Sequence, residues 1–209
     1  MCDYRNTPFC KKLSNLEQKK EHLKKIILSQ HPKQKNIYSK IHDRSLHFFI
    51  DFGEIYNNKC AYCGVSSDVV GLNNFEIDHY ICKAQFDDEE KAGQITNLRF
   101  SCKFCNRKKR DYQIESCYQK ILDPDDIIIS SVFKRASDYR IIISEEYKND
   151  TTIKQFYTKL AFDNQFRRID FLLMNMINYS KKIKNRNIKE KIGSCIELLY
   201  LKKNNILFI

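Results

Sequence analysis

The stretch that decides the fold starts at Cys60-Ala-Tyr-Cys63, runs through Glu76-Ile-Asp78-His79 and closes with Thr96-Asn97-Leu-Arg-Phe-Ser-Cys102-Lys-Phe-Cys105-Asn106-Arg-Lys-Lys109. It contains two C-x2-C pairs separated by a long intervening segment. A small set of polar residues lies between and beside these pairs. The stretch therefore combines a candidate metal site with a candidate reactive site.

The two C-x2-C pairs predict a structural zinc ion. Each pair can present two thiolates, and two pairs complete the tetrahedral set that zinc prefers. The predicted ligands are Cys60, Cys63, Cys102 and Cys105. One alternative is that the four cysteines pack as ordinary small hydrophobic residues, but paired spacing of this kind is uncommon by chance. The other is disulfide bonding, which fits poorly with nine cysteines, no recognisable secretory leader and an expected reducing compartment.

The polar residues are expected to lie on a strand and a helix. Alternating β-branched and aromatic residues predict a strand over 75–81. A regular strand would point Asp78 and His79 to opposite faces. For both to meet one metal ion or phosphate, the strand must bulge or end there. The segment 106–112 contains no Gly or Pro and predicts the start of a helix.

In these motifs the chain resembles the HNH endonucleases, whose pattern joins C-x2-C, Asp-His, Asn-Leu and C-x2-C-Asn-x-x-Lys. The resemblance covers about a quarter of the chain. It implies an α+β fold in which a ββα-metal core is stapled by the four-cysteine zinc site and carries mostly helical N- and C-terminal flanks. The implied regions are a helical N-terminal region (1–58), the HNH nuclease core with its zinc site (59–115) and a mainly helical C-terminal region (116–209).

The resemblance also implies a role for each polar residue. His79 matches the general base, and an imidazole suits this role because its ordinary pKa lies near neutrality. Asp78 and Asn106 match the ligands of a catalytic divalent ion, and their oxygen atoms favour Mg²⁺ or Mn²⁺. Asn97 matches the residue that ties down the loop and orients the strand carrying His79.

Charge and composition favour a nucleic-acid partner. The net charge of +11 indicates a polyanion, and 42% hydrophobic residues indicate a globular protein. No apolar run approaches the roughly 20 residues that a membrane span needs, and a cytoplasmic location is expected. A cluster of cations adjoins the predicted metal site and is expected to bind phosphate, although a solvated helix face is the alternative. Its members are Arg99, Lys103, Arg107, Lys108, Lys109 and Arg110.

The flanks are predicted mainly from hydrophobic periodicity. In the N-terminal region, Ser14-x-x-Glu17 suggests a capping box and His31-Pro32 a helix end. A second helical stretch carries Phe48, Phe49, Phe52 and Ile55. The scattered histidines of this region, including His42, have no partner at ligand spacing and are expected to be packed or solvated.

The C-terminal region is expected to be mainly helical and to hold two short strands and an amphipathic helix. The runs 127–129 and 139–143 predict the strands, and Phe166 to Met176 predicts an amphipathic helix. The strongly basic segment 181–203 could extend a nucleic-acid face. The order of Leu122-Asp-Pro124, two apolar stretches, Leu160 and Arg167-Arg168 resembles the tail of HNH subunits in Septu-type anti-phage systems. That resemblance implies a role in antiviral defence and an ATPase partner protein.

Taken together, the sequence predicts a metal-dependent HNH endonuclease that hydrolyses phosphodiester bonds in DNA. Three alternatives stay open at this point. The protein could be an HNH nuclease that cleaves RNA, because water attack does not need a 2′-hydroxyl group. It could also be a zinc-ribbon module that binds nucleic acid without cutting it, or a structural subunit of a larger complex.

Overall fold

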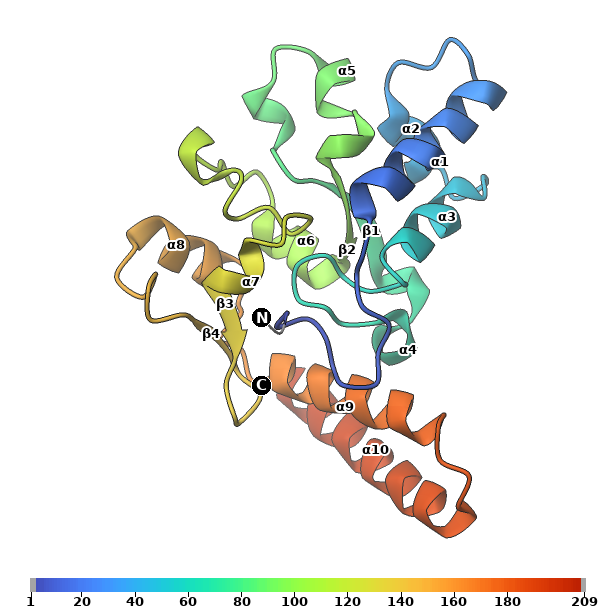
Figure 1. The fold of residues 1–209 in the computed structure, drawn as a ribbon, viewed down its shortest axis with the longest axis vertical. Coiled ribbons are helices and arrows are strands. Elements are labelled where there is room, and N and C mark those ends of the chain that lie inside the picture. Colours follow the sequence, from blue (N-terminus) through green and yellow to red (C-terminus); the bar gives the residue numbers. More distant parts are fainter. Residues whose placement is uncertain (1–2, 208–209) are drawn as a thin grey trace.

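The computed structural model describes residues 3–207 and holds a small ββα unit near its middle (Figure 1). Strand β1 (Phe75–His79) pairs antiparallel with β2 (Leu98–Cys102), and helix α6 (Lys103–Lys109) follows β2 directly. The mixed fold with helical flanks is confirmed. The pairing is continuous over both strands, so β1 contains no bulge and ends at His79, earlier than predicted.

Helix α6 also differs from its predicted bounds. It begins at Lys103, so Cys105 lies within the helix, and Asn106 does not start it. It stops after Lys109 because Arg110 adopts a φ of 49°, in the left-handed region that ends helices. The short helix therefore presents Asn106 and Lys109 from a single turn.

The N-terminal region forms three helices, α1 (Leu16–Gln30), α2 (Ile37–His42) and α3 (Phe48–Ile55). The predicted end at His31-Pro32 is confirmed. The predicted capping box is wrong: α1 starts at Leu16 after Asn15, whose φ is 54°, and no side chain caps the helix. The predicted apolar side of the second stretch is buried, as Phe48, Phe49 and Phe52 show.

Short elements lie within the core and at the start of the C-terminal region. They are α4 (Ser67–Val70), α5 (Glu89–Ala92), α7 (Ile129–Val132) and four 3₁₀ turns at Leu72–Asn74, Lys83–Gln85, Ile95–Asn97 and Ser116–Tyr118.

Besides α7, the described part of the C-terminal region contains a two-stranded sheet and three longer helices. The elements are β3 (Phe133–Arg135), β4 (Ile141–Ile143), α8 (Thr151–Lys159), α9 (Phe166–Ser180) and α10 (Arg186–Leu207). The predicted strand over 127–129 is wrong. The Asp126 side chain accepts a hydrogen bond from the Ile128 N–H at 2.9 Å, which holds a turn, and the Ile127 side chain is exposed. Helices α9 and α10 lie side by side and extend away from the rest of the molecule (Figure 1).

One hydrophobic cluster runs through all three regions, from Leu23 of α1 through Phe100 of β2 to Phe156 of α8. Buried ion pairs reinforce these connections, because Lys20 of α1 and Arg99 of β2 both contact the Asp125 carboxylate. The core of the nuclease-like segment is thus shared with its flanks. Within the described residues, no helix is both long and apolar enough to cross a membrane.

Candidate metal centre and active site

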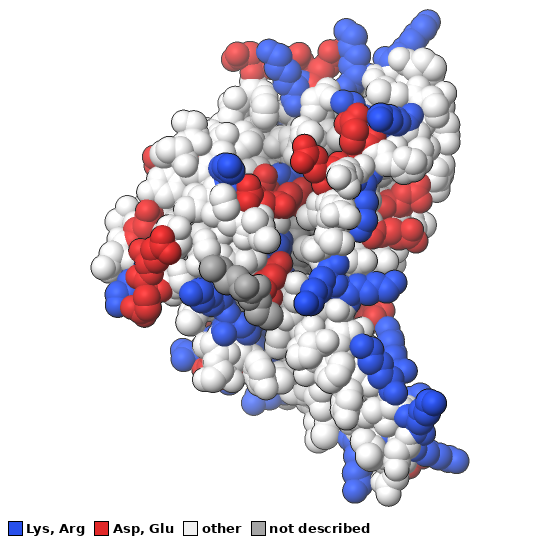
Figure 2. Space-filling model, viewed as in Figure 1, with Lys and Arg blue, Asp and Glu red and all other residues white. Residues whose placement is uncertain are grey.

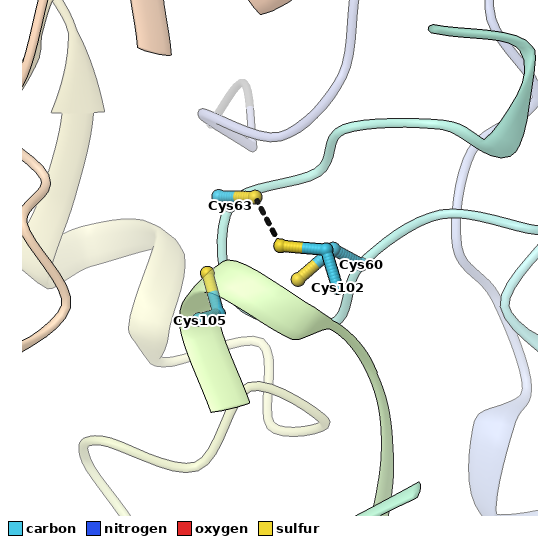
Figure 3. Close-up of side chains that lie close together, drawn as sticks. All are labelled: Cys60, Cys63, Cys102 and Cys105. Carbon is cyan, nitrogen blue, oxygen red and sulfur yellow. Dashed lines mark hydrogen bonds between the residues drawn. The ribbon is translucent and has the colours of Figure 1, made fainter. Parts of the chain in front are cut away.

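The four predicted zinc ligands converge at one place (Figure 3). Their sulfur atoms all lie within 4.8 Å of one another, and all four side chains are buried. The Cys63 and Cys102 sulfur atoms are 3.8 Å apart. Tetrahedral zinc with Zn–S bonds of about 2.3 Å separates its sulfur ligands by about 3.8 Å. The chemistry and spacing of this thiolate set therefore fit a zinc ion, and none of the four cysteines forms a disulfide.

Local structure explains why the cysteines meet. Cys60 and Cys63 flank a tight turn closed by the Gly64 N–H, which donates to the Cys60 carbonyl at 2.9 Å. Gly64 has a φ of 79°, and a side chain there would collide with Arg5. Cys102 ends β2, and Cys105 lies in the first turn of α6. The strand-to-helix junction and the turn thus each supply one pair.

Arg167 is an additional residue of the metal centre. From α9, its Nη2 donates to the Cys105 sulfur at 3.1 Å and to the Leu160 carbonyl at 2.9 Å, and the side chain is buried. A guanidinium at this place offsets the negative charge that four thiolates bring to zinc. The sequence marked Arg167 only as part of a tail pattern, because nothing local predicts its contact with the distant Cys105.

The Asp78 side chain is buried and has two polar partners. Its Oδ1 accepts from Lys109 Nζ at 3.1 Å, and its Oδ2 accepts from the Tyr62 hydroxyl. Burial raises the pKa of the Asp78 carboxyl, and the Lys109 charge opposes this rise. Asp78 is therefore held in a buried ion pair, with both oxygens engaged.

His79 points elsewhere, as strand alternation requires. Its imidazole packs against the Tyr38 ring, with ring centroids 4.3 Å apart, and Tyr38 in turn stacks on His42 at 5.0 Å. Within the described residues, His79 Nε2 is buried and has no hydrogen-bond partner. Burial, together with the nearby charges of Lys83 and Lys109, lowers the pKa of His79 to about 4, so the ring is neutral at pH 7.

His42 was expected to be an ordinary packed or solvated histidine, and it stacks on Tyr38 beside the site. Tyr38 itself is a site residue that the sequence did not reveal. Burial raises the pKa of its hydroxyl, and the charges of Glu76 and Asp78 raise it further. Tyr38 thus lies near both the imidazole and the carboxylates.

Asn97 makes the contacts expected of a residue that tethers a loop. Its Nδ2 donates to the carbonyls of Ile81 at 3.0 Å and Ala92 at 2.9 Å, and its Oδ1 accepts from the Ile81 N–H at 2.8 Å. The side chain spans both ends of the loop that follows His79. These three bonds also explain why β1 ends where it does.

Asn106 lies next to a carboxylate other than the predicted one. Its Nδ2 donates to Glu76 Oε2 at 2.8 Å. Glu76 and Asp78 are two residues apart and so share one face of β1. This Glu-x-Asp spacing is the signal that could have identified Glu76 from the sequence.

The oxygen atoms of Glu76, Asp78 and Asn106 form an incomplete ligand set for a hard divalent ion. Glu76 and Asn106 are already adjacent, and carboxylate and amide oxygens suit Mg²⁺, which commonly takes one or two carboxylates together with substrate phosphates. Asp78 can join them only if Lys109 gives up its contact. Among the described residues, the four cysteines form the sole cluster of three or more His, Cys, Asp or Glu side chains close enough to hold a metal. A second ion would therefore depend on Asn106 and on the substrate for ligands.

The predicted phosphate-binding cluster divides into two groups. Arg99 is buried and pairs with Asp123 at 2.6 Å, and Lys109 is fully buried against Asp78. Neither side chain is exposed to a nucleic acid in this structure, so a phosphate contact from either stays a prediction that requires its ion pair to open. The other members lie at or near the surface and line one groove: Lys103, Arg107, Lys108 and Arg110.

Residues 60–111 match the family model described as HNH endonuclease. The matched segment contains the four cysteines, both strands of the central hairpin and α6, so this part of the chain is an HNH endonuclease domain. Such a domain indicates a nuclease that interacts with nucleic acid. Comparisons with curated proteins and with solved structures found no match. The Septu-like tail pattern lies outside the matched residues.

The Lys109–Asp78 pair leads to a prediction about stability. Lys109→Met should lower the free energy of unfolding by about 3–5 kcal/mol, because it leaves a buried carboxylate without its partner. The double variant Lys109→Met/Asp78→Asn should recover much of that loss. Denaturant unfolding in zinc-containing buffer measures both effects. Lys108→Met, an exposed neighbour, is the matched control and should change little. Equal stability of Lys109→Met and this control would contradict the buried-pair assignment.

Proposed function

We propose that the protein is a metal-dependent endonuclease that hydrolyses phosphodiester bonds in DNA, with His79 as the general base. One observation carries the proposal: a neutral, partly buried imidazole lies at the end of β1, inside the HNH domain, and its Nε2 atom has no hydrogen-bond partner among the described residues. A general base must have an unprotonated nitrogen available for the proton that it removes. His79 is the sole histidine within residues 60–111.

In the proposed reaction, His79 Nε2 takes the proton of an attacking water. Because Nε2 is shielded from solvent in this structure, a neighbouring side chain such as Tyr38 has to move for that water to enter. Lys109 Nζ donates to the His79 carbonyl at 2.7 Å, and Asn97 holds the following loop. These contacts orient the imidazole without touching the substrate.

Asp78 and Asn106 are the proposed protein ligands of a catalytic Mg²⁺ or Mn²⁺, and Glu76 supports Asn106 through its hydrogen bond. When bound, the ion would polarise the scissile phosphate and stabilise the leaving oxygen. Recruiting Asp78 would require Lys109 to exchange its carboxylate partner for a substrate phosphate. A lysine in contact with Asp78 is well placed for such an exchange.

The decisive experiment offers the purified, zinc-loaded protein a plasmid, a linear duplex, single-stranded DNA and RNA, each with Mg²⁺, with Mn²⁺ and without added divalent ion. Divalent-dependent cleavage of DNA is the expected result, with a 3′-hydroxyl and a 5′-phosphate as the new ends. Cleavage confined to RNA would support the RNA nuclease alternative. Binding without cleavage of any substrate would support a non-catalytic zinc-ribbon module.

A role in anti-phage defence, an ATPase partner and a cytoplasmic location are further proposals that rest on the sequence alone. The tail residues Leu122, Leu160 and Arg167 are all buried, and Arg167 bonds both the Leu160 carbonyl and the Cys105 sulfur of the HNH domain. Their pattern is thus accounted for by packing. Co-purification of the tagged full chain with an ATPase encoded beside it would support the partner.

A further inference from the structure

A groove of about 1300 Å³ lies on the side of α6 that faces the C-terminal region. Its lining includes Lys103 and Arg107 of α6, Arg110 just after that helix, and Lys154, Thr158 and Lys159 of α8. Residues of α9 and α10, including Phe166 and Tyr200, complete the lining. The groove is therefore formed jointly by the HNH domain and residues outside the family match.

The charges of this groove are strongly one-sided. Apart from Arg167, which contacts the Cys105 sulfur, six cations line it without an acidic partner among the described residues: Lys103, Arg107, Lys108, Arg110, Lys154 and Lys159. Within the described part of the chain, Asp170 is the sole acid of the lining, and Lys203 already neutralises it at 2.5 Å. Cations gathered in a hollow without counter-charges attract a polyanion more strongly than cations on a convex face.

Aromatic side chains lie between these cations. Phe104 and Phe166 meet edge to face with centroids 4.5 Å apart, and Tyr112 and Tyr200 also line the groove. Phe104, Tyr112 and Tyr200 are partly exposed. Alternating cations and aromatic rings are the combination that binds single strands, since the rings can stack only on bases that are unpaired.

The groove and the His79 site lie on different sides of the same helix. Asn106 and Lys109 face β1, whereas Lys103, Arg107 and Arg110 face the groove. An α-helix with its side chains is about 10–12 Å across. A strand in the groove is therefore separated from the proposed base by the width of α6.

We infer that this groove binds a single-stranded segment of nucleic acid, which anchors the substrate beside the site that cleaves it. The substrate class rests on the proposed function, but the binding itself does not require cleavage. The anchored segment and the cleaved phosphate belong to neighbouring parts of one polynucleotide that passes around α6. The α8 cations then govern affinity from outside the HNH domain.

The test is a binding titration of the full chain with a fluorescent single-stranded oligonucleotide, without added divalent ion, over a range of salt concentrations. The Lys154→Gln/Lys159→Gln variant should bind at least about tenfold more weakly, with a log–log salt slope shallower by about 1.4, because each lost contact with a single strand removes about 0.7. The matched control is Lys189→Gln/Lys191→Gln, which removes the same charge from exposed positions on α10. It should bind within about twofold of the parent protein.

This control separates the position of the charges from their total number, because α9 and α10 carry many basic side chains on the face seen in Figure 2. Equal weakening by both variants would mean that total charge governs binding and would overturn the groove assignment, as would unchanged binding by both. A blunt duplex bound as tightly as the single strand would overturn the single-strand assignment. Because the titration needs no cleavage, failure of the groove and failure of the nuclease proposal give different results.

Discussion

Replacing His79 with alanine should abolish cleavage while zinc content, fold and nucleic-acid binding stay close to those of the parent protein. Loss of a positioned general base typically costs about 10²–10⁴ in rate. No other imidazole lies in the HNH domain, and the four cluster thiols would be occupied by the proposed zinc ion, so we expect no neighbouring group to replace it. Single-turnover cleavage with Mg²⁺ or Mn²⁺ measures the effect. His42→Ala is the matched control, since His42 contacts Tyr38 but not His79 in the ring packing.

Variants of the proposed ion ligands should lose activity for a different reason. Asp78→Ala and Asn106→Ala should weaken divalent-ion binding, and high Mn²⁺ should partly restore their cleavage but not that of His79→Ala. Asp78→Ala also leaves the buried Lys109 without its carboxylate partner. Asp78→Asn is therefore the better variant for testing the ion ligand. Asn97→Ala should lower the cleavage rate less than these variants do, if Asn97 only orients the loop. Wild-type cleavage by His79→Ala on any substrate that the parent cuts would show that the HNH assignment of the base is wrong.

Replacing Cys60 or Cys102 with serine should release the zinc ion and unfold the ββα unit. Structural zinc contributes on the order of 10 kcal/mol to small metal-nucleated units. The cluster joins the Cys60–Cys63 turn to the β2–α6 junction, so its loss also frees the helix that carries Asn106 and Lys109. Elemental analysis and far-UV circular dichroism measure the two effects. Zinc absent from pure, folded, active parent protein would contradict this prediction.

The remaining cysteines provide the control for zinc content. Cys82 is buried like the ligands but lies outside the cluster, so Cys82→Ser should keep one zinc ion per chain. Serine in place of Cys10, Cys117 or Cys195 should likewise leave one zinc ion per chain, because these cysteines also lie outside the cluster. Cys2 is predicted to be dispensable as well, but it lies outside the described residues. Loss of zinc in Cys82→Ser without unfolding would call for a different ligand set.

The parts of the fold that the sequence predicts best are those with local causes. The C-x2-C spacing fixes four ligands, and the alternation over 75–79 fixes a strand whose residues Asp78 and His79 point apart. The helix end at His31-Pro32 follows from the restriction that proline places on its predecessor. Each of these features depends on a few neighbouring residues.

The misplaced residues depend on distant partners. Arg99 and Lys109 look like surface cations in a basic run, but Asp123 and Asp78 bury them in ion pairs. Arg167 meets Cys105 only after the C-terminal region has packed. The Ser14-x-x-Glu17 pattern failed because the chain enters α1 through Asn15 in a left-handed conformation. For the three arginine and lysine residues, tertiary packing overrides what the local sequence suggests.

Both flanks contact the cysteine cluster, and these contacts determine how short an independently folding fragment of the chain can be. Arg5 donates to the carbonyls of Ala61 and Pro124, and Arg167 donates to the Cys105 sulfur. A piece trimmed to residues 60–111 would lose these arginines and expose the apolar side of its hairpin, including Phe100. The shortest autonomous unit is therefore much longer than the motif by which the family is recognised. Transplanting the motif alone into another protein would transfer its ligands without the scaffold that holds them.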